Sequence, residues 1–120
     1  MDLVWVGIGG ALGSLTRFQI GKIVSKRASI KFPTGTFLIN VSGCILLGII
    51  SNLKLGTNIY LLLGDGFLGA YTTFSTFMYE GFTLFSNHEK LNALIYIWIS
   101  LLLGIIGYKM GSHLVRFFIV

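Results

Sequence analysis

Hydrophobic residues run in four long stretches along this chain, separated by short polar segments. The stretches cover residues 3–23, 36–53, 59–85 and 91–115. Each approaches or exceeds the roughly 20 residues that a helix needs to cross the apolar core of a bilayer. The pattern predicts an all-α membrane protein, a single domain over residues 1–120 with four transmembrane helices and no soluble domain.

The third stretch carries an unusual polar insertion. Residues 66–77 read GFLGAYTTFSTF, which places glycines and hydroxyl groups in the middle of an apolar segment. Non-helical backbone at membrane depth is tolerated only where it is buried in protein or lines a water-filled cavity. Polar groups held at that depth are candidates for function. We therefore expect a break in this helix near residues 69–73, with the functional site beside it.

Composition supports a membrane location and narrows the function. Hydrophobic residues make up 54% of the chain and charged residues 11%, with a mean hydropathy of +0.84, whereas soluble domains carry about 25% charged residues. The net charge of +5 comes from residues in predicted loops and at helix ends, where lipid headgroups account for it, so nucleic acid is not an expected partner. The sequence has no phosphate-binding loop, catalytic triad or metal-ligand cluster, so an enzyme is not predicted.

The distribution of Lys and Arg gives a weak indication of orientation. The side that holds the first and third loops carries five of them and the opposite side three, namely Lys22, Lys26, Arg27, Lys31 and Lys90 against Lys54, Lys109 and Arg116. Cytoplasmic loops are enriched in positive charge. The bias predicts a multi-pass protein of the cell membrane, either inserted in both orientations or with the first and third loops in the cytoplasm.

Two GxxxG spacings indicate close helix packing. They are formed by Gly9 with Gly13 and by Gly107 with Gly111. Small residues let helices approach closely in lipid, where hydrophobic attraction between helices is absent. We interpret both as packing contacts. Because 120 residues are few for enclosing a pore, we also expect the chain to form an oligomer.

Several polar residues lie within or near the ends of the stretches. Asn40 lies about one turn inside the second stretch, where a buried amide without partners costs several kcal/mol. It therefore either bonds across helices or faces an aqueous path. Arg17 is expected to have a structural role, and Glu80 is either its ionic counterpart or a group at a pore mouth. Asp65 is expected at the membrane interface.

The fourth stretch has one less apolar face. Tyr96, Ser100, Gly104 and Tyr108 follow each other at intervals of four residues, so they share a slowly drifting face of a helix. This face is either a polar lining or a packing surface of small residues with interfacial tyrosines.

Phe74 and Phe77 are spaced to share one helix face. The edge of an aromatic ring carries partial positive charge, so it can meet a small anion without the tight binding of a formal charge. Two such phenylalanines are ordinarily core packing. The surrounding hydroxyl residues favour the anion-binding interpretation here.

These motifs together resemble the Fluc (CrcB) fluoride channel family. The resemblance runs from the first stretch to the fourth, and the segment TTFSTF is its most specific part; the matching residues are Gly9, Gly10, Arg17, Gly35, Thr36, Asn40, Gly43, residues 66–69, residues 72–77 and Glu80. It implies an antiparallel dimer with two pores that exports fluoride passively and confers fluoride resistance.

The resemblance also implies roles for individual residues. Phe74, Phe77 and Asn40 would line the fluoride path, and Ser75 and Thr76 would supply polar groups at the helix break. A structural Na⁺ at the dimer interface would be held by backbone carbonyls of Gly69 and Thr72 from each subunit.

The fourth stretch leaves alternatives open. The family's polar track there corresponds to Tyr96 and Ser100, which keep hydroxyls, while Gly104 and Tyr108 depart from the expected small hydroxylated residues. The chain is thus either a channel made of identical subunits or a subunit that conducts only with a second homologous one. A coupled transporter of the small multidrug kind is a weaker alternative, because Asp2 is the only carboxylate near the first stretch.

Overall fold

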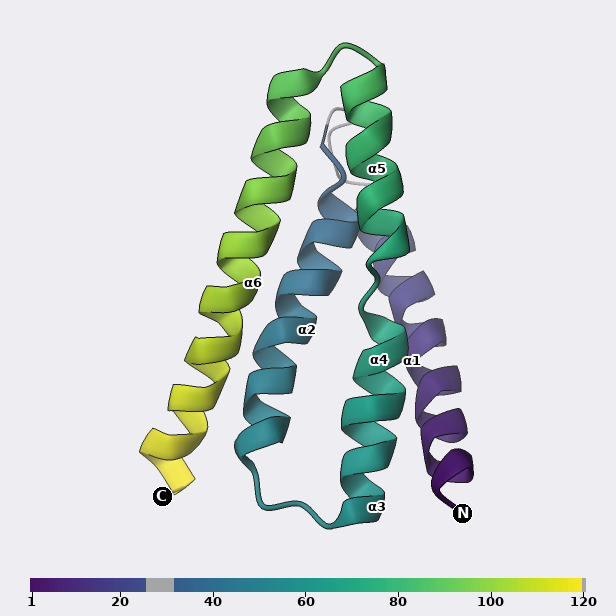
Figure 1. Cartoon of the computed structure of the whole chain (residues 1–120). Helices are drawn as coiled ribbons and strands as arrows, with labels where there is room; N and C mark the ends of the chain where they lie inside the picture. The colour runs from purple at the N-terminus through teal and green to yellow at the C-terminus, as the bar shows by residue number, and fades with distance from the viewer. Residues whose placement is uncertain (26–31, 120) are drawn as a thin grey trace.

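The computed structural model describes residues 1–25 and 32–119, and the elements in these ranges are helical. Four rods lie side by side, with both chain termini at the same end (Figure 1). The first, second and fourth rods are single helices, namely α1 (Asp2–Ser25), α2 (Thr34–Asn52) and α6 (Lys90–Ile119). The third rod consists of four consecutive elements: α3 (Thr57–Tyr60), the π-helix η1 (Leu61–Leu68), α4 (Gly69–Tyr71) and α5 (Ser75–Ser86). The predicted all-helical fold with four apolar rods is confirmed. Lys26, Arg27 and Lys31, which were used for orientation, lie outside the described residues.

The exposed surface of the rods is apolar, as lipid requires. Two helices, α2 and α6, are long and apolar enough to cross a membrane, and only 17% and 22% of their apolar windows are buried inside the chain. The core helix of a soluble protein would be mostly covered. Large apolar side chains such as Leu3, Phe18, Phe82 and Trp98 are exposed on the other rods and on α6. A water-soluble monomer rarely exposes so much contiguous apolar surface, which identifies a membrane protein.

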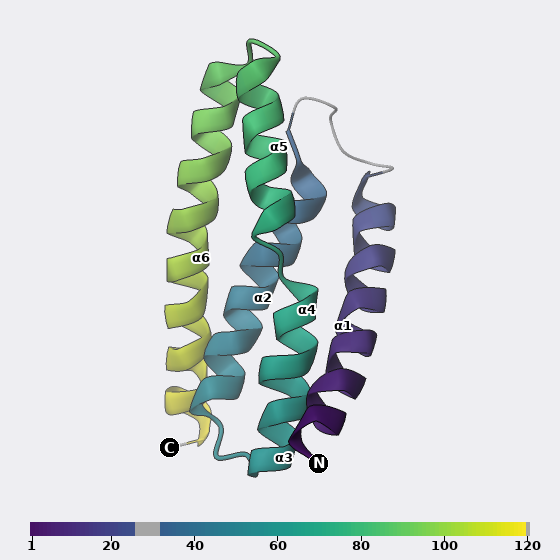
Figure 2. The same ribbon diagram turned by 45° about the vertical axis from the view of Figure 1, so that its right-hand side comes forward.

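Glycines set the two closest helix contacts. Helix α1 lies along η1 and α4 on the side away from α6 (Figure 2). A Cβ atom on Gly13 would lie 2.1 Å from the Phe67 carbonyl oxygen. On the α2–α6 contact, a Cβ on Gly111 would lie 2.2 Å from the Ile45 oxygen. The backbones therefore touch directly, in agreement with the packing interpretation of both GxxxG spacings.

The third rod is not helical between α4 and α5. Helix α4 ends at Tyr71, Thr72 has an extended backbone with φ −79° and ψ 158°, and α5 begins at Ser75. Figure 1 shows the two helices as separate segments joined by a short length of non-helical chain. Helix α4 therefore continues two residues beyond Gly69, where we expected the irregular backbone to begin.

Candidate functional site

Asn40 of α2 binds the non-helical segment from the side. Its Nδ2 atom donates to the Thr73 carbonyl at 2.8 Å, and its Oδ1 atom accepts from the Thr73 N–H at 2.9 Å. One side chain thus pairs both backbone groups of a residue outside a helix, where unpaired groups would be costly in an apolar setting. Of the two alternatives for Asn40, bonding across helices is the one observed, and the residue also lines a cavity described below.

The two predicted phenylalanines lie together but in different environments. Their ring centroids are 6.1 Å apart with an interplanar angle of 45°. Phe74 is 73% exposed, whereas Phe77 is 6% exposed and packs on Tyr96 of α6, with centroids 5.1 Å apart. The pair therefore runs from the interior of the chain to its surface at the start of α5.

Buried hydroxyl groups lie behind this aromatic pair. The hydroxyls of Tyr96 and Ser100, one turn apart on α6, are buried without a hydrogen-bond partner among the described residues. Tyr96 is fully buried, and Thr36 of α2 does not bond its hydroxyl. Thr36 Oγ1 instead donates to Glu80 Oε1. Buried polar groups are usually paired, so this cluster is an exception beside the candidate site.

A large cavity opens next to the non-helical segment. Its volume is about 910 Å³. It is lined by predicted site residues of four elements, namely Asn40, Gly69, Thr72, Phe74, Phe77 and Ser100, together with Gly104 and Tyr108. Three of the residues predicted to share one face of α6, namely Ser100, Gly104 and Tyr108, thus line the same cavity. Tyr96 lies buried at one end of this face. Gly104 faces Cys44, whose Sγ atom would lie 3.4 Å from an added Cβ.

Asp65 lines the same cavity, and its expected place at the membrane interface stays a prediction. It lies within η1, eight residues after the rod begins at Thr57. The π-helical turn around it packs against α1, because the backbones of Gly66 and Gly9 approach each other closely. Lys109 of α6 lines the same cavity. Asp65 and Lys109, which carry opposite charges, therefore line one concave surface.

A smaller cavity of about 520 Å³ shares Thr73 with the larger one and is more polar. Arg17 and Lys22 of α1 line it, together with Thr36, Thr76 and Glu80. The structure thus brings Arg17 and Glu80 to the wall of one cavity, while the bond that Glu80 accepts comes from Thr36. Ser75 is absent from the linings of both cavities.

Gly69 and Thr72 both line the larger cavity, next to the non-helical segment. The Thr73 N–H, which would bond the Gly69 carbonyl in a continued helix, bonds Asn40 instead. An added Cβ on Gly69 would meet nothing within 4 Å. The Thr72 side chain turns back to the Leu68 carbonyl at 2.9 Å. Oxygen atoms of a backbone without a helix partner are the ligand type that a hard cation prefers.

Sequence reasoning missed two members of the site. Thr36 lies one turn before Asn40 on α2, so the shared helix face was a signal that both side chains point to the third rod. Phe32 packs on Tyr96 with ring centroids 5.4 Å apart and an interplanar angle of 86°. It precedes the first residue of α2 and lies outside the apolar stretches, so helix periodicity gave no signal for it.

The fold and the site define a class: an all-helical membrane protein whose polar and aromatic groups gather around a non-helical segment of its third rod. Comparison with known proteins identifies the family. The model of the family described as CrcB-like protein, Camphor Resistance (CrcB) matches residues 4–112, and this chain belongs to that family. The resemblance inferred from the motifs is confirmed.

The chain is similar over nearly its whole length to curated relatives. It is 60% identical over 114 residues to a protein of Clostridium acetobutylicum named fluoride-specific ion channel FluC 2, covering 95% of this chain and 97% of the relative. It is 40% identical over 116 residues to fluoride-specific ion channel FluC of Acidobacterium capsulatum, covering 92% and 93%.

Proposed function

We propose that this protein is a fluoride-selective channel that lets the anion leave the cytoplasm passively. The names of its relatives support a fluoride substrate. The observation that carries the proposal within this chain is the Phe74–Phe77 ring pair beside the unpartnered hydroxyls of Tyr96 and Ser100. Ring edges and hydroxyl hydrogens offer a small anion several weak interactions, and weak multiple sites permit conduction.

A passive path suffices for export. Fluoride enters cells as neutral HF under acid conditions and is trapped as the anion in the more alkaline cytoplasm. An inside-negative membrane potential drives the anion outward by about 2.3 kcal/mol per charge per 100 mV. The protein would therefore act in the cell membrane and confer fluoride resistance without an energy source of its own.

In this proposal the channel is an antiparallel dimer with two pores. The larger cavity and the 73% exposed ring of Phe74 lie on one face of the single chain. A second copy covering that face would remove the ring from lipid and close the cavity into a path. Asn40, Phe77, Thr76, Tyr96 and Ser100 would then line each path, with Ser75 close to the helix junction.

We further propose a structural Na⁺ at the dimer axis. The Gly69 and Thr72 carbonyls fit this role, because the Thr73 N–H that would pair with Gly69 bonds Asn40 instead. Two carbonyls from one chain leave a small cation incompletely surrounded, so the second pair would come from the other subunit. The bound ion would supply positive charge near the anion path.

Thermal stability tests the sodium site. We expect the melting temperature of the purified dimer in detergent to rise with Na⁺ concentration when N-methylglucamine replaces it at constant ionic strength, because an ion that binds only the folded assembly stabilises it. Lysozyme in the same detergent serves as the control for general salt effects. Equal melting temperatures with and without Na⁺ would contradict the site.

Liposomes that contain only this chain test the channel itself. We expect fast fluoride efflux and no chloride efflux above that of empty liposomes. The second candidate function is a subunit that needs a different homologous partner, which the Gly104 and Tyr108 departures favour. Efflux that appears only after co-reconstitution with such a partner would establish it. No fluoride efflux from folded protein in either case would overturn the proposed function.

A further inference from the structure

Phe32 lies at a fixed position at the start of α2. The Thr34 N–H donates to the Phe32 carbonyl at 2.8 Å, and the Thr34 hydroxyl donates to the same oxygen at 3.2 Å. Pro33 between them has φ −77° and ψ 74°, the values of an inverse γ-turn. Because the proline ring restricts φ to this region, the turn holds Phe32 against the bundle before α2 begins.

The ring of Tyr96 lies between two other aromatic rings. Phe32 meets it in a T-shaped arrangement at 5.4 Å, and Phe77 meets it at 5.1 Å with an angle of 54°. Gly81 of α5 lies beside the ring, since an added Cβ would be at an ordinary contact distance of 4.0 Å from Tyr96 Cδ2. Tyr96 is 0% exposed. Its ring is therefore held by neighbours on α5 and at the start of α2.

This position decides where the Tyr96 hydroxyl lies. The hydroxyl is buried, and no partner bonds it among the described residues. Its place is thus set by packing of the ring and not by a hydrogen bond of its own. Aromatic contacts with this geometry add stability beyond the area they bury.

Phe32 lines the smaller cavity and begins a series of ring contacts that leads to the larger one. It lines the smaller cavity together with Thr36 and Glu80, whereas its partner in the ring chain, Phe77, lines the larger one. The rings of Phe32, Tyr96, Phe77 and Phe74 form a continuous series of contacts between the two.

We infer that Phe32 is a positioning residue for Tyr96: its ring, together with that of Phe77, holds the Tyr96 ring and thereby sets the place of the buried Tyr96 hydroxyl. Its effect on conduction rests on the proposed function, whereas its effect on the position of Tyr96 does not. Removing the ring while keeping an apolar side chain lets Tyr96 tilt toward the space vacated.

Fluorine NMR of the full-length protein, labelled with 3-fluorotyrosine, tests the positioning. The Tyr96 resonance is assigned by its loss in Tyr96→Phe. We expect Phe32→Leu to shift or broaden this resonance and Phe32→Tyr, which keeps the ring, to restore it. The matched control is Phe37→Leu, because Phe37 also contacts Phe32, at 5.8 Å, but lines neither cavity. A Tyr96 resonance that is unchanged in Phe32→Leu would overturn the inference.

Fluoride efflux from liposomes tests the consequence for conduction. We expect Phe32→Leu to slow efflux about tenfold, the upper range for loss of one aromatic pair, with Phe32→Tyr and Phe37→Leu within about twofold of the parent protein. Unchanged efflux in Phe32→Leu would refute a role in conduction even where the resonance moves. If the parent protein itself does not conduct, the proposed function fails, and the NMR result alone decides the positioning role.

Discussion

Replacing Phe74 by isoleucine will slow fluoride efflux at least about tenfold while leaving the folded protein intact. Isoleucine keeps an apolar side chain but has no ring edge with partial positive charge, so the anion loses one of its few weak partners. Phe74 is 73% exposed within the chain, so the exchange removes little internal packing. Phe77→Ile should slow efflux similarly, with an added loss of stability because Phe77 packs on Tyr96.

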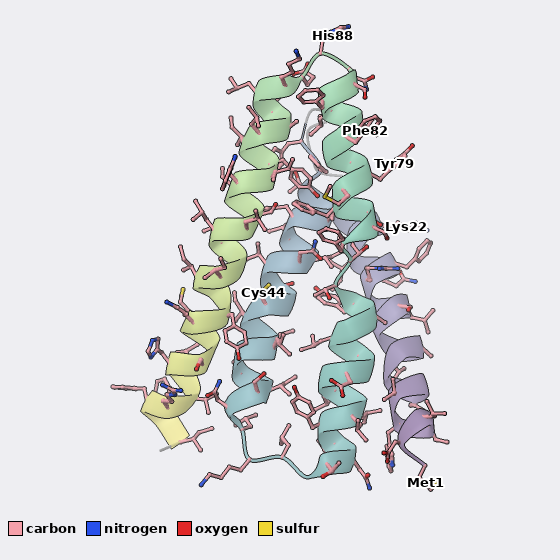
Figure 3. The ribbon with its side chains drawn as sticks, in the orientation of Figure 1. Met1, Lys22, Cys44, Tyr79, Phe82 and His88 are labelled. Atoms are coloured by element: carbon pink, nitrogen blue, oxygen red, sulfur yellow. The ribbon has the colours of Figure 1, made fainter. Side chains whose placement is uncertain are left out.

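Phe82 provides the matched control for this experiment. It lies two turns further along α5, is 70% exposed and points away from the bundle, as does Tyr79 (Figure 3). It lines neither cavity. Phe82→Ile should therefore retain the efflux rate of the parent protein. Parent-like efflux in both Phe74→Ile and Phe77→Ile, with the dimer intact by size-exclusion chromatography, would refute the role of the rings.

Gly9→Ala is expected to destabilise the fold by about 3 kcal/mol, the upper end for overpacking. An added Cβ would lie 2.0 Å from the Leu62 carbonyl oxygen and 2.9 Å from the Phe67 nitrogen, both of which belong to the backbone of η1. Backbone atoms cannot turn aside as a flexible side chain does, so α1 and η1 must separate. Gly13→Ala should act alike, since its Cβ would lie 2.1 Å from the Phe67 oxygen.

The adjacent glycine makes this prediction specific. Gly10 lies on the same helix, but an added Cβ there would have its nearest neighbour at 3.9 Å, an ordinary contact distance. Gly10→Ala should therefore melt close to the parent protein. The measurement is the thermal midpoint of the detergent-purified protein. Equal midpoints for Gly9→Ala and Gly10→Ala would show that the close approach of α1 and η1 does not carry stability.

Stability and conduction depend on different parts of the molecule in these two predictions. The glycine contacts join α1 to η1 and α2 to α6, and they set the distance between rods. The rings and hydroxyls lie where α5 meets α2 and α6. A variant such as Phe74→Ile can therefore lose flux while it keeps its fold.

Asn40 illustrates how far sequence reasoning reached within the site. An amide inside an apolar stretch must find partners, so the sequence predicted that it bonds or faces water, and could not choose between these. The choice depends on Thr73, which is 33 residues away along the chain and whose two backbone groups pair with the amide.

Adjacent residues were enough to predict the four apolar rods, the membrane environment and the family, since hydrophobic runs and a rare local motif are local properties. The same motif led to Phe74 and Phe77, whose role in conduction stays a prediction. The folded chain was needed to learn that Asn40 binds Thr73, that Thr36 bonds Glu80, and that the Tyr96 ring lies between Phe32 and Phe77. These contacts join residues far apart in the chain, and they depend on the distance and rotation between rods. Those quantities are set by where backbones meet at the glycines. The spacing of glycines along one helix indicates a close contact, but it does not tell which backbone each glycine meets.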